Sequence, residues 1–163
     1  MTKPIVGILL GSKSDWDSMK PCAETLRDFG IPFEARVASA HRTPEVVRDY
    51  CISAEERGLK VLIGAAGMAA HLAGAMAAAT HLPVLGVPMP SPLMNGLDAV
   101  LSTVQMPGGI PVATFAVGKA GATNAALFTV AMLANEDTTL REKLLAHRKA
   151  MAEKILGHGE LKL

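Results

Sequence analysis

Aromatic residues are scarce in this chain: only 4% of its 163 residues are Phe, Trp or Tyr. Neither sign of charge dominates, because the formal net charge is +1 and the Lys and Arg residues are scattered along the chain. We therefore expect no nucleic-acid partner, which would favour a clustered basic surface. The only two cysteines, Cys22 and Cys51, fall on the apolar faces of expected helices, which is typical of small core residues in a reducing compartment.

The chain also lacks a long uninterrupted hydrophobic run. The apolar stretch from Leu62 to Val87 contains His71, His81 and Pro83, so we expect buried helix and strand there and no membrane span. No Cys, His and carboxylate residues share the spacing of metal ligands. No signal peptide is visible before the first apolar run. These absences predict a cytoplasmic protein without a metal site.

Short apolar runs are abundant, and they alternate with helical patterns. The runs cover residues 5–10, 33–39, 59–66, 83–89 and 110–117, and the helices between them end near residues 30, 58, 79, 104 and 134. Continuous apolar strands indicate a parallel sheet that helices cover on both faces. Right-handed crossovers and the chain length favour a three-layer flavodoxin-like α/β fold with a five-stranded sheet in the order 2-1-3-4-5. The run 33–39 carries Glu34 and Arg36, so it is expected at an edge.

One further helix is expected at residues 138–156, after the sheet is complete. Its apolar residues Leu140, Leu144, Met151 and Ile155 form a helical stripe. Such a stripe packs either on its own domain or on a neighbouring subunit, and the pattern alone leaves both open. We predict a single domain over residues 1–163.

Three unusual loops follow strands that this order places side by side: residues 11–16, 39–44 and 64–71. In doubly wound sheets, ligands bind beyond the carboxyl ends of the strands, where the strand order reverses. In the first loop, Ser12 and Ser14 offer hydroxyls and Asp15 can cap a helix. The free amides of that helix start favour an anion, although ordinary helix capping explains the same residues.

The second loop, SAHRTP, ends with a good helix start in Thr43 and Pro44. Neither His41 nor Arg42 is needed for that turn. Arginine can bind a phosphate through two parallel hydrogen bonds, and an imidazole titrates near neutrality. The position of His41 and Arg42 at the carboxyl end of a strand predicts that the two residues act together in binding or catalysis.

The third loop places Gly64 and Gly67 where a helix is expected to begin. Small residues there would allow the backbone to approach a ligand closely. His71 falls in the first turn of that helix, where capping, packing and catalysis are all compatible with the pattern. The loop lacks the G-x-G core of a dinucleotide-binding motif.

Six ordered motifs resemble the PurE family, class I: GSKSDW, SAHRTP, GAAGMAAHL, LPVLGVP, QMPGGIPVAT and GKAGATNAAL. The resemblance covers residue 4 to about residue 135. It implies N5-carboxyaminoimidazole ribonucleotide mutase activity in purine (IMP) biosynthesis, which moves a carboxylate from the exocyclic nitrogen of the substrate to ring carbon C4 without metal, biotin or ATP, so no cofactor is expected. It also implies a homo-octamer whose C-terminal helices reach neighbouring subunits.

Site residues carried over from the family fall into three groups. The resemblance implies His41 as the general acid/base. The implied ligands of the ribose and phosphate are Ser12, Ser14, Asp15 and Arg42. The implied lining around the imidazole and carboxylate is Ser39, Ala40, Gly67, Ala70, His71 and Leu72.

Three residues depart from the family pattern. Met68 stands in place of a glycine, Ala73 in place of a proline and Ala38 in place of a valine. We expect Met68 to matter most, because it lies beside the expected carboxylate pocket. Two other functions fit parts of the pattern. One is the class II reaction, direct carboxylation of aminoimidazole ribonucleotide, and the other is a non-catalytic sugar-phosphate binding module.

The implied chemistry explains why a histidine and an arginine are adjacent. Carboxylate migration requires one proton to be given at nitrogen and one to be removed at carbon, and a single imidazole can do both in turn. A small dry pocket of Ala and Gly residues would hold the carbon dioxide formed between these steps. Arg42 would hold the phosphate so that the ring lies over His41.

Overall fold

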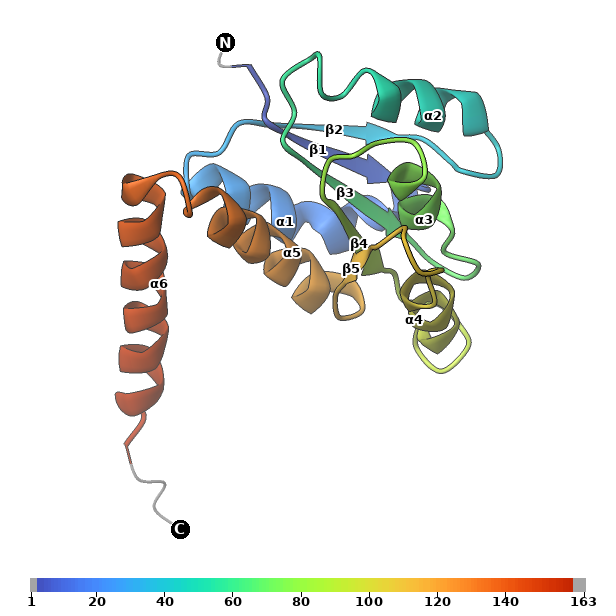
Figure 1. Ribbon diagram of the computed structural model, residues 1–163. Helices are drawn as coiled ribbons and strands as arrows, with labels where there is room; N and C mark the ends of the chain where they lie inside the picture. The colour runs from blue at the N-terminus through green and yellow to red at the C-terminus, as the bar shows by residue number, and fades with distance from the viewer. Residues whose placement is uncertain (1–2, 160–163) are drawn as a thin grey trace. The chain divides into compact units, whose positions relative to one another are not determined.

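The structure is a computed structural model that describes residues 3–159, and Figure 1 traces the chain. It contains two compact units, one that ends at Leu127 and one that begins at Phe128. The first unit holds the sheet and the three loops. A single domain over residues 1–163 stays a prediction, and residues 1–2 and 160–163 lie outside the described part.

Five strands form one parallel sheet in the order β2-β1-β3-β4-β5, as predicted. They are β1 (Val6–Leu10), β2 (Phe33–Val37), β3 (Val61–Ala66), β4 (Val84–Pro88) and β5 (Ala113–Thr114). The predicted edge position of β2 is confirmed. At the carboxyl edge, Leu10 pairs with Val37 on one side and with Ala65 on the other. The register therefore brings the ends of β1, β2 and β3 together.

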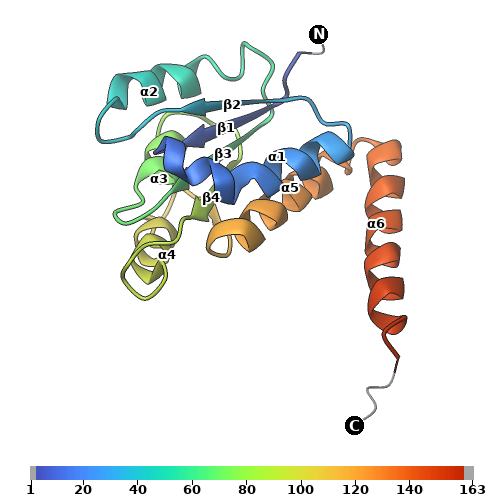
Figure 2. The same cartoon turned by 180° about the vertical axis from the view of Figure 1, so that it is seen from behind.

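Helices cover both faces of this sheet (Figures 1 and 2). The helical segments of the first unit are η1 (Lys13–Asp15, a 3₁₀ turn), α1 (Trp16–Asp28), α2 (Pro44–Ile52), α3 (Leu72–Ala77), α4 (Leu97–Val104) and the beginning of α5 (Gly118–Leu133). Helices α2, α3 and α4 lie on one face. Helix α1 and the part of α5 that precedes Phe128 lie on the other. This is the predicted three-layer α/β arrangement.

The largest differences from the predicted elements are in β5, α2 and α3, which are clearly shorter than predicted. Strand β5 has only two residues in place of the run 110–117; Pro111 has no amide to donate to a neighbouring strand. Helix α2 ends at Ile52, before the predicted stop near residue 58, and the next hydroxyl, that of Ser53, lies 2.8 Å from the Asp49 carbonyl and 3.2 Å from the Tyr50 carbonyl. Helix α3 begins only at Leu72, so residues 67–71 form a longer loop than the helix predicted from residue 68.

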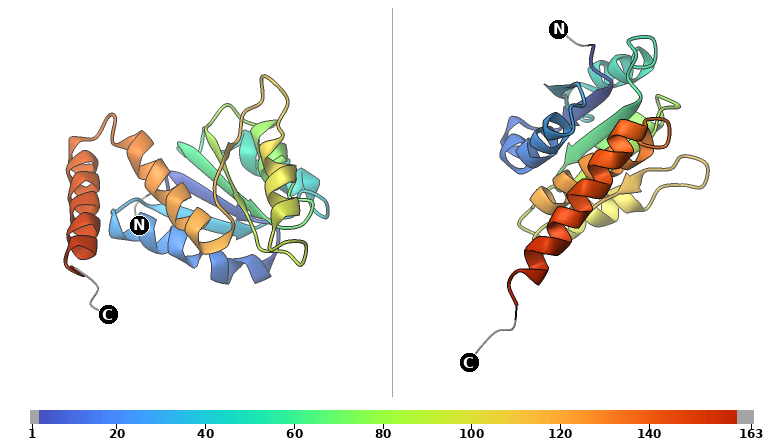
Figure 3. Two further views of the ribbon diagram at one scale, coloured as in Figure 1. Left: turned by 90° about the horizontal axis from the view of Figure 1, so that it is seen from below. Right: turned by 90° about the vertical axis from the view of Figure 1, so that its left-hand side faces the viewer.

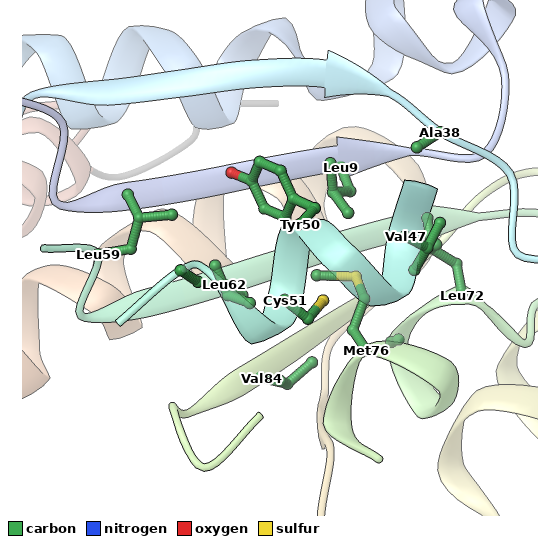
Figure 4. Close-up of a cluster of buried hydrophobic side chains, with 12 residues drawn as sticks. Leu9, Ala38, Val47, Tyr50, Cys51, Leu59, Leu62, Leu72, Met76 and Val84 are labelled. Carbon is green, nitrogen blue, oxygen red and sulfur yellow. The ribbon is translucent and has the colours of Figure 1, made fainter. Parts of the chain in front are cut away.

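One cluster of buried side chains joins the sheet to α2 and α3 (Figure 4). Its larger members are Leu9, Val47, Tyr50, Cys51, Leu59, Leu62, Leu72, Met76 and Val84. Cys51 is 1% exposed and Cys22, on α1, is 0% exposed, which confirms both cysteines as core residues. Burial raises the pKa of Cys22 to about 12 and that of Cys51 to about 11, so both thiols stay protonated at neutral pH.

Glycines let helices approach the centre of the sheet. Gly64 pairs with Gly86 across β3 and β4. A Cβ atom on Gly64 would lie 2.7 Å from the sulfur of Met76 on α3, and one on Gly86 would lie 2.6 Å from the Thr103 methyl group on α4. The prediction that Gly64 opens the ligand loop is therefore wrong, because Gly64 lies inside β3 and makes room for α3.

The second unit contains the end of α5 and the whole of α6 (Thr138–Leu156), which Figure 3 shows as one straight element. The Asp137 carboxylate caps α6 by accepting a hydrogen bond from the Leu140 amide at 3.0 Å. No residue of α6 is buried, and Met151 and Ile155 of the predicted stripe are 48% and 70% exposed. Packing within its own unit therefore leaves this part of the stripe uncovered. Among residues 3–159, no helix has the length and apolar character of a membrane span.

Candidate active site

The three predicted loops meet at the carboxyl edge of the sheet. The Gly11 amide, just after β1, donates to the Ala65 carbonyl of β3 at 2.9 Å. The Ala38 amide, just after β2, donates to the Leu10 carbonyl of β1 at 2.9 Å. Both bonds extend the sheet past the strand ends, so the loops begin from fixed positions.

Ser12 organises the first loop. Its hydroxyl accepts from the Ser14 amide at 3.3 Å and lies 2.8 Å from the Ser14 hydroxyl. Its own amide donates to the Asp15 carboxylate at 3.1 Å, which completes a capping box around η1. Asp15 does lie at the cap position of α1, but its side chain makes no capping bond to α1 and instead accepts from the Ser12 amide.

Asp15 is a partly buried carboxyl group of the first loop, and its surroundings shift its pKa. Burial raises the pKa of its carboxyl group above the ordinary value, while hydrogen bonds from Ser12 and Ser14 oppose the rise. When it is ionised, such a carboxylate is a strong acceptor for hydroxyl groups of a ligand.

Ser39 and Thr43 close the turn of the second loop. The Thr43 hydroxyl accepts from the Ser39 amide at 2.9 Å and lies 3.1 Å from the Ser39 carbonyl. Pro44 begins α2, as predicted, and Thr43 is at the cap position. However, the Thr43 hydroxyl makes no capping bond to α2, because the turn uses it.

Arg42 connects the second loop to the first. Its Nη2 donates to the Gly11 carbonyl at 3.1 Å, and its Nε donates to the Ser39 hydroxyl at 3.4 Å. The side chain is exposed. A guanidinium has five N–H donors, so these two contacts orient the group and leave donors for an anion.

His41 connects the second loop to the third. Its Nε2 lies 2.9 Å from Nδ1 of His71, and the two rings are nearly perpendicular at 86°. One nitrogen donates and the other accepts, so at most one of the two rings is doubly protonated while this bond lasts. His71 occupies the cap position of α3 but makes no capping bond. Its side chain therefore serves the pair with His41.

The third loop contains a strained residue. Met68 has φ +57°, in the left-handed region that costs a residue other than glycine about 1 kcal/mol. Its side chain is 65% exposed. The backbone thus retains a conformation that suits the glycine of the family pattern, although a methionine is present. Gly67 lies close to the chain after β4, with Met89 3.3 Å from the place of a Cβ atom.

Two of the predicted lining residues are buried, since Ala70 and Leu72 are each 2% exposed. The Leu72 side chain belongs to the core cluster beneath α2. Ser39 and Ala40 are partly exposed, and His71 is exposed. Ala70 and Leu72 can therefore reach a ligand only through their backbone or through a small part of their surface.

Sequence reasoning missed two participants in this geometry. The Gly11 carbonyl holds Arg42, and the Ser102 hydroxyl on α4 accepts from the Ala70 amide at 2.9 Å. Gly11 lies in the motif GSKSDW, but nothing there indicates a role for its carbonyl, and Ser102 lies in no motif, although a serine inside an apolar helix is a signal worth following. Of the remaining histidines, His81 and His158 are exposed and lie outside the three loops. Within residues 3–159, no three His, Cys, Asp or Glu side chains gather as metal ligands.

Comparison with known proteins finds close relatives of this chain. A family model described as AIR carboxylase matches residues 5–154. N5-carboxyaminoimidazole ribonucleotide mutase of Pseudomonas aeruginosa is 51% identical over 156 residues, which are 96% of this chain and 96% of that protein. The protein of the same name from Bacillus subtilis is 49% identical and covers 94% and 95% of the two chains.

Two further matches are a much longer protein and a solved crystal structure. Bifunctional purine synthesis protein purC/E of Dictyostelium discoideum is 50% identical over 155 residues, and this chain spans only 16% of its length. The crystal structure of Treponema denticola PurE aligns with a TM-score of 0.83 at 29% identity and covers 94% of this chain and 95% of that one. Because the family model and half-identical relatives each cover nearly the whole chain, this protein belongs to the AIR carboxylase (PurE) family.

Proposed function

We propose that this protein is a class I PurE enzyme that converts N5-carboxyaminoimidazole ribonucleotide to 4-carboxy-5-aminoimidazole ribonucleotide in purine biosynthesis. The observation that supports this most directly is the His41–His71 pair, 2.9 Å apart, beside Arg42 at the carboxyl edge of the sheet. An acid/base group and a phosphate-binding cation are thus neighbours, as the reaction requires. Relatives named for the mutase reaction support the same conclusion.

His41 is proposed as the proton carrier. When the N–CO₂⁻ bond breaks, carbon dioxide leaves and the exocyclic nitrogen takes one proton from the imidazolium of His41. Ring carbon C4 then attacks the carbon dioxide, and His41 takes the proton that C4 loses. The two transfers cancel, so the reaction is an isomerisation that consumes no co-reactant. His71 holds the His41 ring at its Nε2 atom and can share its proton.

Small residues are proposed to surround the carboxylate and the carbon dioxide. Ala40, Gly67 and Ala70 lie in the two loops that His41 and His71 join. Such residues expose little polar surface, which disfavours water and limits escape of carbon dioxide into solvent. Ser39 and the backbone of Leu72 complete the proposed lining.

Ribose and phosphate are proposed to bind on the Ser12 side of the edge. The Arg42 guanidinium is already oriented by Gly11 and Ser39, so little side-chain freedom is lost when it binds an anion. Ser12 and Ser14 offer hydroxyls, and the Asp15 carboxylate accepts from sugar hydroxyls. Phosphate contacts would hold the reacting ring in place over His41.

Direct carboxylation of aminoimidazole ribonucleotide is a second candidate reaction, because the matching family model is described as AIR carboxylase. Labelled bicarbonate separates the two. A mutase given unlabelled N5-carboxyaminoimidazole ribonucleotide should form product quickly and almost without label. Turnover of aminoimidazole ribonucleotide with labelled carbon dioxide, and none of the N-carboxylated compound, would establish the carboxylase. If neither compound turns over but the ribonucleotide binds, the protein is a binding module.

We also infer a cytoplasmic homo-octamer in which α6 packs on a neighbouring subunit. The family resemblance implies this assembly. The exposed apolar residues of α6, among them Met151 and Ile155, support it because they offer apolar surface to a second chain.

A further inference from the structure

Two consecutive hydroxyl side chains of α4 contact the loop that carries His71. The Ser102 hydroxyl accepts from the Ala70 amide at 2.9 Å and lies 3.1 Å from the Met68 carbonyl. The Thr103 hydroxyl lies 3.3 Å from the Ala70 carbonyl. Both backbone groups of Ala70, which is 2% exposed, are therefore met by α4.

The bond from the Ala70 amide is the firmest of these contacts. The hydroxyl hydrogen of Ser102 has a nearer acceptor in its own helix, the Asp98 carbonyl at 2.7 Å, and that of Thr103 has the Ala99 carbonyl at 2.7 Å. Each hydroxyl has one hydrogen but two lone pairs. Ser102 can thus donate within α4 and accept from Ala70 at the same time.

The contacted segment is the strained part of the loop. Met68 has φ +57° without the freedom of a glycine, and Ala70 directly precedes His71. The His71 amide in turn donates to the Ala69 carbonyl at 2.9 Å, so the His71 backbone follows any movement of residues 69 and 70. A shift of about 1 Å there would remove Nδ1 of His71 from hydrogen-bond distance of His41.

We propose that Ser102 is a positioning residue for the transfer site: its hydroxyl holds residues 68–70 so that His71 faces His41. This role rests on the proposed function, since it matters for turnover only if the histidine pair handles the proton. Ser102 itself touches no reacting group and acts through the loop. Thr103 supports the same segment more weakly, because the Ala70 carbonyl at 3.3 Å must share the one hydroxyl hydrogen of Thr103 with the nearer Ala99 carbonyl.

Helix stability alone does not explain Ser102. Serine is a poorer helix former than alanine, and Ser102 lies in the interior of α4. Ser102→Ala should therefore leave α4 intact and remove only the contact with the loop. The buried Ala70 amide would then lack this partner, and the loop would move to satisfy it.

The test compares three variants of the full-length enzyme. Ser102→Ala removes the hydroxyl, and Ser102→Thr retains it. Ser53→Ala is the matched control, because the Ser53 hydroxyl also bonds a carbonyl four residues earlier (Asp49, 2.8 Å) but serves the end of α2. For each variant we would measure kcat and KM for N5-carboxyaminoimidazole ribonucleotide, the thermal midpoint, and the His41–His71 distance in a crystal structure.

We expect Ser102→Ala to lower kcat by about tenfold or more with little change in KM, because misplacement of a catalytic group by 1 Å can lower rates by up to ~10². Its His41–His71 distance should exceed 3.5 Å. Ser102→Thr should recover both values, and Ser53→Ala should match the parent. Thr103→Val, with Thr123→Val as its control, provides a second variant should Ser102→Ala fold poorly, and a smaller change of the same kind is expected.

Two outcomes separate this proposal from the proposed function. An unchanged His41–His71 distance in Ser102→Ala overturns the positioning role, whatever happens to turnover. A lengthened distance in a protein whose parent shows no mutase activity supports the positioning role and contradicts the proposed function.

Discussion

At the scale of single residues, two polar side chains of the site make hydrogen bonds other than those that their residue types suggest. Thr43 and Asp15 have the residue types of helix caps, yet their side chains bond backward, to Ser39 and Ser12. These bonds stiffen the two loops that carry the hydroxyls and Arg42. As a result, the exposed groups His41 and Arg42 are held in place by neighbours that do not themselves need to touch the substrate.

His41→Asn should retain the fold and the affinity for the ribonucleotide while turnover falls by at least ~10²-fold, the scale of general acid/base catalysis. Asparagine can still bond to His71 but cannot carry the proton. His81→Asn is the matched control, because His81 is exposed and lies outside the three loops. Steady-state kinetics measure the effect, and activity within a few-fold of the parent would exclude His41 as the proton carrier.

Asp15→Asn should change the pH dependence of stability and also lower the affinity for the substrate, and the two effects can be measured separately. Because burial raises the pKa of Asp15, the folded protein binds a proton there more tightly than the unfolded chain does. The stabilising contribution of Asp15 is therefore complete at pH values below its unfolded pKa and is lost as the pH rises through its folded pKa.

Denaturant titrations of parent and Asp15→Asn across pH 3–8 measure this difference. The stability of the variant relative to the parent should rise with pH and level off above the folded pKa of Asp15. Substrate affinity should fall, because a neutral amide replaces the carboxylate. A variant whose relative stability falls as the pH rises would show that the hydrogen bonds from Ser12 and Ser14 outweigh burial.

At the scale of secondary-structure elements, the sheet brings the loops together and the glycines bring the helices close. Gly64 and Gly86 are paired neighbours in β3 and β4, and Ala73 of α3 lies close to both. Helix α4 approaches Gly86 through Thr103, the residue next to Ser102. The close packing of α4 on β4 is therefore what places the two hydroxyls against the His71 loop.

Gly86→Ala should destabilise the protein by about 1–3 kcal/mol, the usual effect of overpacking a core. The new Cβ atom would lie 2.6 Å from the Thr103 methyl group and 3.0 Å from a methyl group of Val112. Gly108→Ala is the control, since no atom lies within 4 Å of its Cβ position. Chemical denaturation measures both variants.

Adding Thr103→Ser to Gly86→Ala removes the methyl group at 2.6 Å and should restore part of the lost stability. Equal free energies of unfolding for parent and Gly86→Ala would contradict the close approach of α4 to β4.

At the scale of the whole molecule, α6 carries large apolar side chains that remain exposed in the single chain. Leu145, Met151, Ile155 and Leu156 are between 48% and 78% exposed on a helix with no buried residue. Exposed apolar side chains gathered on one element are typical of a surface between subunits. This is the physical argument for assembly, and it is independent of the family resemblance.

Light scattering should give a mass about eight times that of the 17.0 kDa chain. Ile155→Gln should weaken the assembly, because it places an amide where the stripe offers an apolar side chain. Lys154→Gln, one residue earlier and equally part of α6, should leave it intact. A monomer at micromolar concentration, or equal effects of the two substitutions, would contradict assembly through this stripe.

Much of this molecule was determined by the sequence itself. Apolar runs and helical patterns predicted the order of elements, the parallel sheet and the edge position of β2, because burial on two faces leaves a direct signature in each strand. The motifs also selected the three loops. Element ends were predicted less well: α2 ends at Ile52 and β5 has only two residues, because local backbone bonding is not visible in a hydrophobic pattern.

Only the tertiary structure decided which side chains meet. His41 and His71 are 30 residues apart, and Arg42 and Gly11 are 31 apart, so no local pattern links them. They come together because the register pairs Leu10 with both Val37 and Ala65, which aligns three strand ends at one edge. Ser102 reaches Ala70 for the same kind of reason, since glycines in the sheet allow α4 to approach. Contacts between distant segments depend on sheet register and packing distance, which are properties of the folded chain as a whole.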